Sequence, residues 1–146
     1  LCLKLEKDNL KLPAHLFIGA CKAPHIPFTI PKISHLPDDE FIINLKEIYK
    51  GIPGDVYDNK ELLELFTPML RSDFHLLEHI SYEEIVPIST AITVFGGQTD
   101  AIVSESQLDA WKEYTGNFRK HMFQGNHFFI HEEHTSIIEA MILSLS

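Results

Sequence analysis

Apolar and polar positions alternate along the chain between two patterns, one typical of buried strands and one of amphipathic helices. Nearly continuous apolar runs, bounded by proline, glycine or polar residues, predict strands at 14–21, 91–95 and 118–123. Apolar residues at helical spacing predict helical segments at 1–11, from Pro37 to Gly51, over 58–81, from Ser104 to about Tyr114, and at the C-terminal end. Because strands alternate with helices, the order predicts an α/β fold with a parallel sheet.

The middle of the chain has helical patterns but no strand pattern. Three acidic residues after Pro37 form a favourable first turn, because they face the positive end of the helix dipole. Asp58, with Glu61 three residues later, is the predicted N-cap of the next helix, and Pro68 is expected to split or kink that helix. Such an insertion at the carboxyl ends of strands usually covers a site. The predicted division is a core of residues 1–36 and 82–146 and a helical lid at 37–81.

Two further helices are predicted in the last third of the chain. Ser104 and Gln107 have the spacing of a capping box. The final helix is expected to start with a solvated turn at 131–134. Its predicted buried stripe consists of Ile137, Ile138, Met141, Ile142 and Leu145.

Composition and charge exclude several classes of protein. The 146 residues suffice for one domain, and the net charge of −9 argues against nonspecific binding to nucleic acid or to an anionic membrane. No apolar run reaches the roughly 20 residues of a membrane span. Two cysteines without metal-type spacing do not suggest a disulfide framework, so a reducing cytoplasm is expected. An uncapped helix pattern at Leu1 and a sheet of three strands favour the later part of a longer protein.

Asp100 and His127 are the candidate catalytic pair. Each follows an apolar strand that breaks at glycine, and neighbouring parallel strands bring their carboxyl ends together. An acid followed in the chain by a histidine is the order of an α/β-hydrolase triad after its nucleophile. The alternative is that Asp100 only caps the following turn and that His127 is a polar residue at a strand end. The chain contains no G-x-S-x-G motif for the nucleophile.

Other reactive residues are weaker candidates. Ser104 and Ser106 lie at a helix start, where serine is a common cap. Cys21 at a strand end could form a Cys–His–Asp set, although a buried cysteine is more often inert. His131 and His134 are three residues apart, unlike the pair of an H-E-x-x-H zinc motif, and no third ligand is evident. No metal site or cofactor is expected.

A series of short motifs resembles the ordered landmarks of type II thioesterases, the stand-alone α/β-hydrolases that accompany nonribosomal peptide and polyketide synthetases. The motifs are Ala23-Pro24-His25, Gly51-Ile52-Pro53, PMLRSDF at 68–74, VFGGQTD at 94–100, Trp111 and FQGNHFF at 123–129. The likeness extends from roughly residue 10 to 145. It implies the C-terminal part of an α/β-hydrolase sheet, with Asp100 as the triad acid and His127 as the triad base.

The resemblance also implies a substrate and a missing part. The family removes aberrant acyl groups from the phosphopantetheine thiol of acyl or peptidyl carrier proteins, beneath a lid that corresponds here to 37–81. The expected acyl-channel residues of the lid are Phe66, Met69, Leu70 and Phe74. The serine nucleophile belongs to an elbow upstream of Leu1, and residues 1–11 match the end of the helix that follows it. This chain alone is therefore expected to be inactive and to need the N-terminal half of its fold.

Two alternatives remain at the level of the sequence. One is a lidded esterase that acts on small free esters, and the other is a non-catalytic module that binds carrier proteins. Because carrier proteins are usually acidic and this chain is acidic too, docking would need a local basic patch. The candidate patch is Lys4, Lys7, Lys11 and Lys22.

Overall fold

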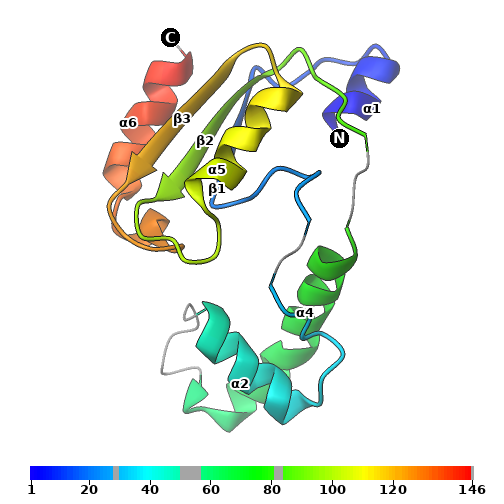
Figure 1. The fold of residues 1–146 in the computed structure, drawn as a ribbon, viewed down its shortest axis with the longest axis vertical. Helices are drawn as coiled ribbons and strands as arrows, with labels where there is room; N and C mark the ends of the chain where they lie inside the picture. Colours follow the sequence, from blue (N-terminus) through cyan, green and yellow to red (C-terminus); the bar gives the residue numbers. More distant parts are fainter. Residues whose placement is uncertain (28–29, 50–56, 81–83, 146) are drawn as a thin grey trace. The chain divides into compact units, whose positions relative to one another are not determined.

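The computed structural model describes residues 1–27, 30–49, 57–80 and 84–145. These residues belong to two compact units, one made of 1–26 and 82–146 and the other of 27–81. The first unit contains the sheet and is called the sheet unit below. The second is helical and is called the helical unit (Figure 1). Residues 27–36, which the sequence grouped with the core, cluster with the helices.

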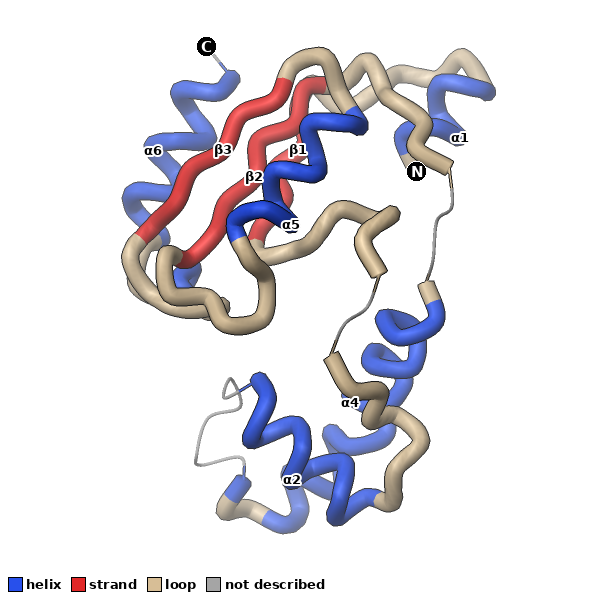
Figure 2. The backbone as a smooth tube through the Cα atoms, viewed as in Figure 1, coloured by secondary structure: helices blue, strands red, loops and turns tan. Residues whose placement is uncertain are grey.

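Three parallel strands form the sheet, in the order β1-β2-β3 (Figure 2). The strands are β1 (His15–Gly19), β2 (Ala91–Gly97) and β3 (Phe118–Phe123). All three strands predicted from apolar runs are confirmed. The central strand β2 is buried from Ile92 to Gly97, because both of its faces are covered and both of its edges are paired.

Short helices cover both faces of this sheet (Figure 1). On one face, α5 (Glu105–Asp109) and the 3-10 turn η1 (Ala110–Tyr114) pack against Ile92 and Val94 of β2. On the other face, α6 (His134–Leu145) packs through Ile137 against Phe95. The alternation of side chains along β2 therefore divides the sheet unit into two apolar layers. The capping box at Ser104 is confirmed, with both of its hydrogen bonds present.

Two predictions about the last helix are wrong. Residues Phe129–His131 form a separate 3-10 turn, η2, so that α6 begins at His134 rather than at 131. Ile138 and Ile142 are 54% and 60% exposed, and Leu145 is exposed too. The helix lies on one face of the sheet and buries only one narrow stripe of side chains there. Its apolar residues are spread over a wider part of its circumference, so some of them are exposed.

The first helix, α1 (Cys2–Lys7), is shorter than the predicted segment 1–11. Asn9 has a φ of +52°, and the backbone N–H of Leu10 donates to the carbonyl of Leu5. A left-handed asparagine after the last turn is a common way to end a helix, which explains the early stop.

The helical unit is built from α2 (Asp38–Tyr49) and α4 (Lys60–His79). Its core contains Ile33, Phe41, Leu45 and Phe74, and the rings of Phe41 and Phe74 meet edge to face at 5.8 Å. The predicted end of the first helix at Gly51 lies outside the described residues. No helix within the described part of the chain is long and apolar enough to cross a membrane.

One prediction about α4 is wrong, and of the two alternatives predicted for Pro68, a split or a kink, the split is wrong. Its N-cap is Asn59 rather than Asp58, and the Asn59 side chain accepts the N–H of Leu62 at 3.2 Å. Pro68 does not split the helix, which is continuous from Lys60 to His79. Proline removes one backbone donor, but Leu70 and Phe74 after it pack in the core of the unit and Thr67 before it is buried. Tertiary packing provides most of the stability of a helix in a protein.

Candidate active site

The carboxyl ends of β2 and β3 are joined beyond the strands by backbone hydrogen bonds. The N–H of Gln98 donates to the carbonyl of Phe123 at 2.8 Å, and the N–H of Thr99 donates to the carbonyl of Gly125 at 3.0 Å. Gly125 has a φ of +106°, a conformation that side chains disfavour, and the chain turns there toward His127. The two loops that present the acid and the imidazole are therefore held together by their backbones.

Asp100 is held from several directions. Its side chain is 1% exposed, and Oδ1 accepts the backbone N–H groups of Ile102 at 2.7 Å and Val103 at 3.0 Å. Its Oδ2 lies 2.9 Å from Nδ1 of His127. Asp100 thus caps the following turn and also contacts His127, so capping is not its only interaction, and its role as a triad acid stays a prediction. The backbone bonds fix the orientation of the carboxylate toward the imidazole.

His127 has one ring nitrogen bound and one available. Because a carboxylate accepts, Nδ1 of the ring donates its proton to Asp100. The ring edge packs against Phe128, with the centroids 5.2 Å apart, and the side chain is 22% exposed. Among the described residues, no group makes a hydrogen bond to Nε2. This arrangement leaves Nε2 as an acceptor for a proton from a nucleophile, as in a nucleophile–His–acid triad.

The comparison with known families decides the class of the protein. A thioesterase domain matches residues 1–144, which is nearly the whole chain. The chain belongs to the thioesterase family. The likeness to type II thioesterases that the motifs predicted is confirmed at this level, and so is the α/β-hydrolase fold.

Relatives of this thioesterase chain occur in pathways for peptide antibiotics. It is 36% identical over 130 residues to linear gramicidin dehydrogenase LgrE of Brevibacillus parabrevis, covering 86% of this chain and 49% of that protein. It is also 36% identical over 141 residues to gramicidin S biosynthesis protein GrsT of Aneurinibacillus migulanus, covering 96% and 54%. The chain therefore spans about half the length of these curated relatives.

Solved structures of similar proteins agree with this assignment. YbtT, a type II thioesterase from the yersiniabactin NRPS/PKS pathway, superposes with a TM-score of 0.82 at 30% identity, covering 97% of this chain and 57% of YbtT. ClbQ, from the colibactin NRPS/PKS pathway, gives a TM-score of 0.86 at 28% identity, covering 99% and 63%. The arrangement of strands and helices described above is therefore that of known thioesterases.

The weaker nucleophile candidates have other surroundings in this thioesterase chain. The Ser104 side chain accepts the N–H of Gln107, as a cap does, and Ser104 Oγ lies 3.0 Å from Ser106 Oγ. Cys21 as a residue is exposed, but burial of its thiol group raises the pKa, and the nearby Lys22 ammonium only partly opposes this. A raised pKa keeps the thiol protonated, which disfavours a Cys–His–Asp set because the thiolate is the nucleophile.

The two histidines of the predicted first turn of the last helix have other surroundings than His127. His131 stacks on Phe128, with the ring centroids 6.4 Å apart, and His134 begins α6. Within the described ranges, no three His, Cys, Asp or Glu side chains are grouped so that they could hold a metal ion.

The four predicted lid residues lie on two faces of α4. Phe74 is buried in the core of the helical unit, and Leu70 packs against that core. Met69 is 53% exposed and Phe66 is partly exposed. The exposed face also includes apolar residues that the sequence did not single out, namely Leu65, Leu76, Leu77 and Ile80. Helical periodicity shows that both faces are apolar but cannot tell which of them is covered.

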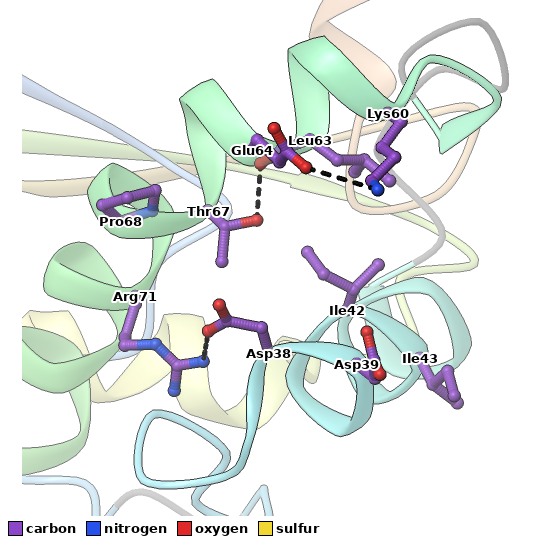
Figure 3. A pocket seen from close by; sticks show the side chains of 10 residues that line it. All are labelled: Asp38, Asp39, Ile42, Ile43, Lys60, Leu63, Glu64, Thr67, Pro68 and Arg71. Atoms are coloured by element: carbon purple, nitrogen blue, oxygen red, sulfur yellow. Dashed lines mark hydrogen bonds and ion pairs between the residues drawn. The ribbon is translucent and has the colours of Figure 1, made fainter.

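A groove of about 800 Å³ lies between α2 and α4 in the helical unit (Figure 3). Apolar side chains from both helices line it, with ion pairs beside them. The Arg71 guanidinium lies 2.6 Å from Asp38, and Lys60 lies 3.7 Å from Glu64. Sequence reasoning did not find this groove, because its residues come from two helices whose packing the sequence pattern does not specify.

Two lysines of the predicted basic patch already have partners. Lys4 is 2.8 Å from the Asp8 carboxylate, and Lys22 donates to the carbonyl of Ile26 at 2.5 Å. The Asp8 carboxylate offsets the charge of Lys4, and the Ile26 carbonyl restricts the ammonium group of Lys22. Both lysines are therefore less available to an acidic protein.

Proposed function

We propose that the intact protein hydrolyses thioesters between aberrant acyl groups and the phosphopantetheine thiol of carrier proteins in nonribosomal peptide or polyketide synthesis. The family assignment and the pathway named for YbtT support this substrate class. One observation supports the chemistry most strongly. His127 bonds to the buried Asp100 through Nδ1, while Nε2 is without a hydrogen bond among the described residues.

In the proposed reaction, Nε2 of His127 accepts the hydroxyl proton of a serine as the serine oxygen attacks the thioester carbon. The carbon–sulfur bond then breaks, and the imidazolium gives its proton to the leaving thiolate sulfur. Nε2 then accepts a proton from water as the water oxygen attacks the acyl-serine ester. The bond between the acyl carbon and the serine oxygen breaks, the imidazolium returns its proton to the serine oxygen, and the carboxylic acid is released. Asp100 holds the imidazole in the tautomer with a proton on Nδ1 and stabilises the imidazolium.

In this proposal, the serine and the oxyanion-hole amides belong to a segment of the intact protein upstream of Leu1. The chain spans about half the length of LgrE and GrsT, which is consistent with a further segment of that size. This chain alone is accordingly expected to be inactive, and a cytoplasmic location remains a prediction.

The helical unit is the proposed lid, as the sequence suggested for 37–81. Its two-faced α4 supports a division of roles: Leu70 and Phe74 hold α4 to the core of the unit, and Met69 and Phe66 are available to an acyl chain. In a lid, apolar side chains such as these would exclude water from the acyl-enzyme site.

The proposal is tested with His127→Ala in the intact enzyme, assayed by hydrolysis of an acyl-phosphopantetheinyl carrier protein. We expect the rate to fall by about 10³-fold or more, since loss of one triad member removes most of the chemical rate. His134→Ala, at an exposed position that starts α6, is the matched control and should keep the parent rate. Unchanged hydrolysis by the His127 variant would refute the proposal.

The same assay separates the alternatives. A preference for carrier-bound thioesters over free thioesters and oxygen esters supports the proposed substrate, whereas equal or faster hydrolysis of free esters supports a general esterase. Tight carrier binding without any hydrolysis by the intact protein would support a non-catalytic module. A basic patch that includes Lys7 and Lys11 predicts that carrier binding weakens as salt is raised.

A further inference from the structure

Two backbone segments approach each other closely where β2 ends, next to the loops that carry Asp100 and His127. Gly97 is buried at the end of β2, where it pairs in register with Phe123. A Cβ atom at position 97 would lie 2.6 Å from the carbonyl oxygen of Gly125 and closer still to that of Asn126. Backbone oxygens cannot rotate away as the end of a side chain can, so any side chain at position 97 would displace the loop.

The atoms that would be displaced are bonded on both sides of the catalytic pair. The Asn126 carbonyl accepts the N–H of Phe129 at 3.1 Å, and the Gly125 carbonyl accepts the N–H of Thr99 at 3.0 Å. His127 lies between Asn126 and Phe129, and Thr99 immediately precedes Asp100. Movement of these two carbonyls would therefore shift the imidazole and the carboxylate relative to each other.

We infer that Gly97 is a positioning residue for the proposed reaction. The absence of a side chain lets the loop at 125–126 press against the end of β2, and this contact sets the 2.9 Å hydrogen bond between His127 and Asp100. The inference rests on the proposed function, in which that pair is catalytic. Misplacement of a catalytic group by about 1 Å can cost roughly 10²-fold in rate.

Gly96 provides a matched control on the same strand. It is buried like Gly97 but faces the opposite layer of the sheet unit, where an added Cβ would meet side-chain ends of Leu108 and Met122. These contacts are with flexible side chains in the apolar layer. Gly96→Ala therefore crowds the core but adds no contact with the loop of His127. The two variants add the same methyl group at adjacent residues.

The experiment compares Gly97→Ala and Gly96→Ala in the full-length enzyme. We expect Gly97→Ala to lower kcat by about 10²-fold with KM nearly unchanged, and to shift the proton NMR signal of the His127 Nδ1–H. Gly96→Ala should retain kcat and that signal even where it lowers the melting temperature. The inference is overturned if Gly97→Ala keeps the parent kcat and signal, or if both variants lose activity in proportion to lost stability.

A second variant covers the case in which Gly97→Ala does not fold. Gly125 lies on the other side of the contact, and alanine there is strained because the backbone φ is +106°. The added Cβ itself would lie at an ordinary 3.5 Å from Phe129. It should shift the same signal and lower kcat, and parent-like values would overturn the inference. If His127→Ala keeps full activity, the proposed function fails, but the NMR signal still shows whether Gly97 sets the hydrogen bond.

Discussion

The sheet unit and the helical unit use buried polar groups in different ways. In the sheet unit, Asp100 binds two backbone N–H groups and one nitrogen of His127, and the other imidazole nitrogen stays without a hydrogen bond among the described residues. In the helical unit, Glu78 and Arg71 of α4 direct their hydrogen bonds to the segment that leads into α2. The first arrangement leaves a group available for chemistry, and the second uses its groups for stability.

Glu78 and Arg71 hold opposite kinds of backbone group in this segment. The Glu78 carboxylate accepts the N–H of Ile33 at 2.7 Å, the N–H of Ser34 at 2.9 Å and the hydroxyl of Ser34. The Arg71 guanidinium donates to the carbonyls of Ser34 and Leu36 at 2.5 and 2.7 Å. Two side chains that are seven residues apart on α4 thus satisfy backbone donors and acceptors of the loop at 33–36, which belongs to no helix or strand.

The largest expected effect is on catalysis and tests the proposed role of Asp100 in the sheet unit. Asp100→Asn in the full-length enzyme should lower kcat by about 10³- to 10⁴-fold, because an amide can donate to Nδ1 and stabilise the wrong imidazole tautomer. The fold should survive, since the asparagine oxygen can still accept the N–H groups of Ile102 and Val103. Steady-state kinetics with circular dichroism measures both quantities.

Asp109→Asn is the control for that variant. Asp109 pairs with Lys120 in the same unit, and loss of its charge should leave kcat unchanged. A fall of less than tenfold in Asp100→Asn would contradict a catalytic role for the carboxylate.

The next effect is on the stability of the helical unit. Phe74→Ala removes a ring that packs edge to face on Phe41, and should lower the free energy of unfolding of the helical unit by about 3–5 kcal/mol. Leu76→Ala, at an exposed position of the same helix, should change it by no more than about 0.5 kcal/mol. Urea denaturation followed by hydrogen exchange assigns the change to a unit. Simultaneous loss of protection in β2 would show that the two units unfold together.

Smaller losses are expected where charge holds the loop. Glu78→Gln keeps an acceptor for the backbone N–H groups but weakens all three bonds, and should cost about 1–3 kcal/mol of the stability of the helical unit. Denaturant midpoints measure this cost. Glu64→Gln, at an exposed position of α4, is the control. Equal midpoints for the Glu78 variant and the parent would show that these bonds contribute no net stability.

The same carboxylate predicts a dependence on pH. Burial raises the pKa of Glu78, but the hydrogen bonds from Ser34 and Ile33 outweigh it, so that the pKa in the folded protein lies below the ordinary value. Its stabilisation is therefore complete above the unfolded pKa of about 4.3 and is lost as the pH falls through the folded pKa. Glu78→Gln should flatten this acid loss, and an unchanged acid transition would contradict the assignment.

The sheet and the contact between Asp100 and His127 could be predicted because they follow from local rules. Apolar runs specify buried strands, and parallel strands bring their carboxyl ends together, so the meeting of Asp100 and His127 needed no further information. The role of Gly97 could not be predicted in this way. The sequence does not show which backbone lies against a glycine, and only the fold brings the loop at 125–126 to it.

The errors have a common physical cause. Adjacent capping residues, Asp58 and Asn59, are equally suitable by type, so residue preference alone does not show that the Asn59 side chain accepts the N–H of Leu62. Pro68 weakens a helix locally, but α4 has buried residues before and after it, Thr67 and Phe74, and is one continuous helix. Local preferences of about 1–3 kcal/mol are overridden when tertiary packing contributes more.

The smallest effect on stability sharpens the comparison between the two faces of α4. Met69→Gln changes an exposed side chain, so the free energy of unfolding should change by no more than about 0.5 kcal/mol. If this face lines the acyl channel of the proposed lid, kcat/KM for long acyl-carrier thioesters should fall several-fold, because each lost methylene contact contributes about 0.8 kcal/mol.

Chain length distinguishes this effect from a general loss of activity. Short acyl groups do not extend along the apolar face and should be hydrolysed at the parent rate, whereas the penalty should grow with the acyl chain. Leu143→Gln, at an exposed apolar position of α6, is the matched control and should show no dependence on chain length. A Met69 variant with the same chain-length profile as the parent would remove the exposed face of α4 from the acyl channel. The apolar residues of that face would then need another partner, since a stripe along most of a helix is more than scattered exposure explains.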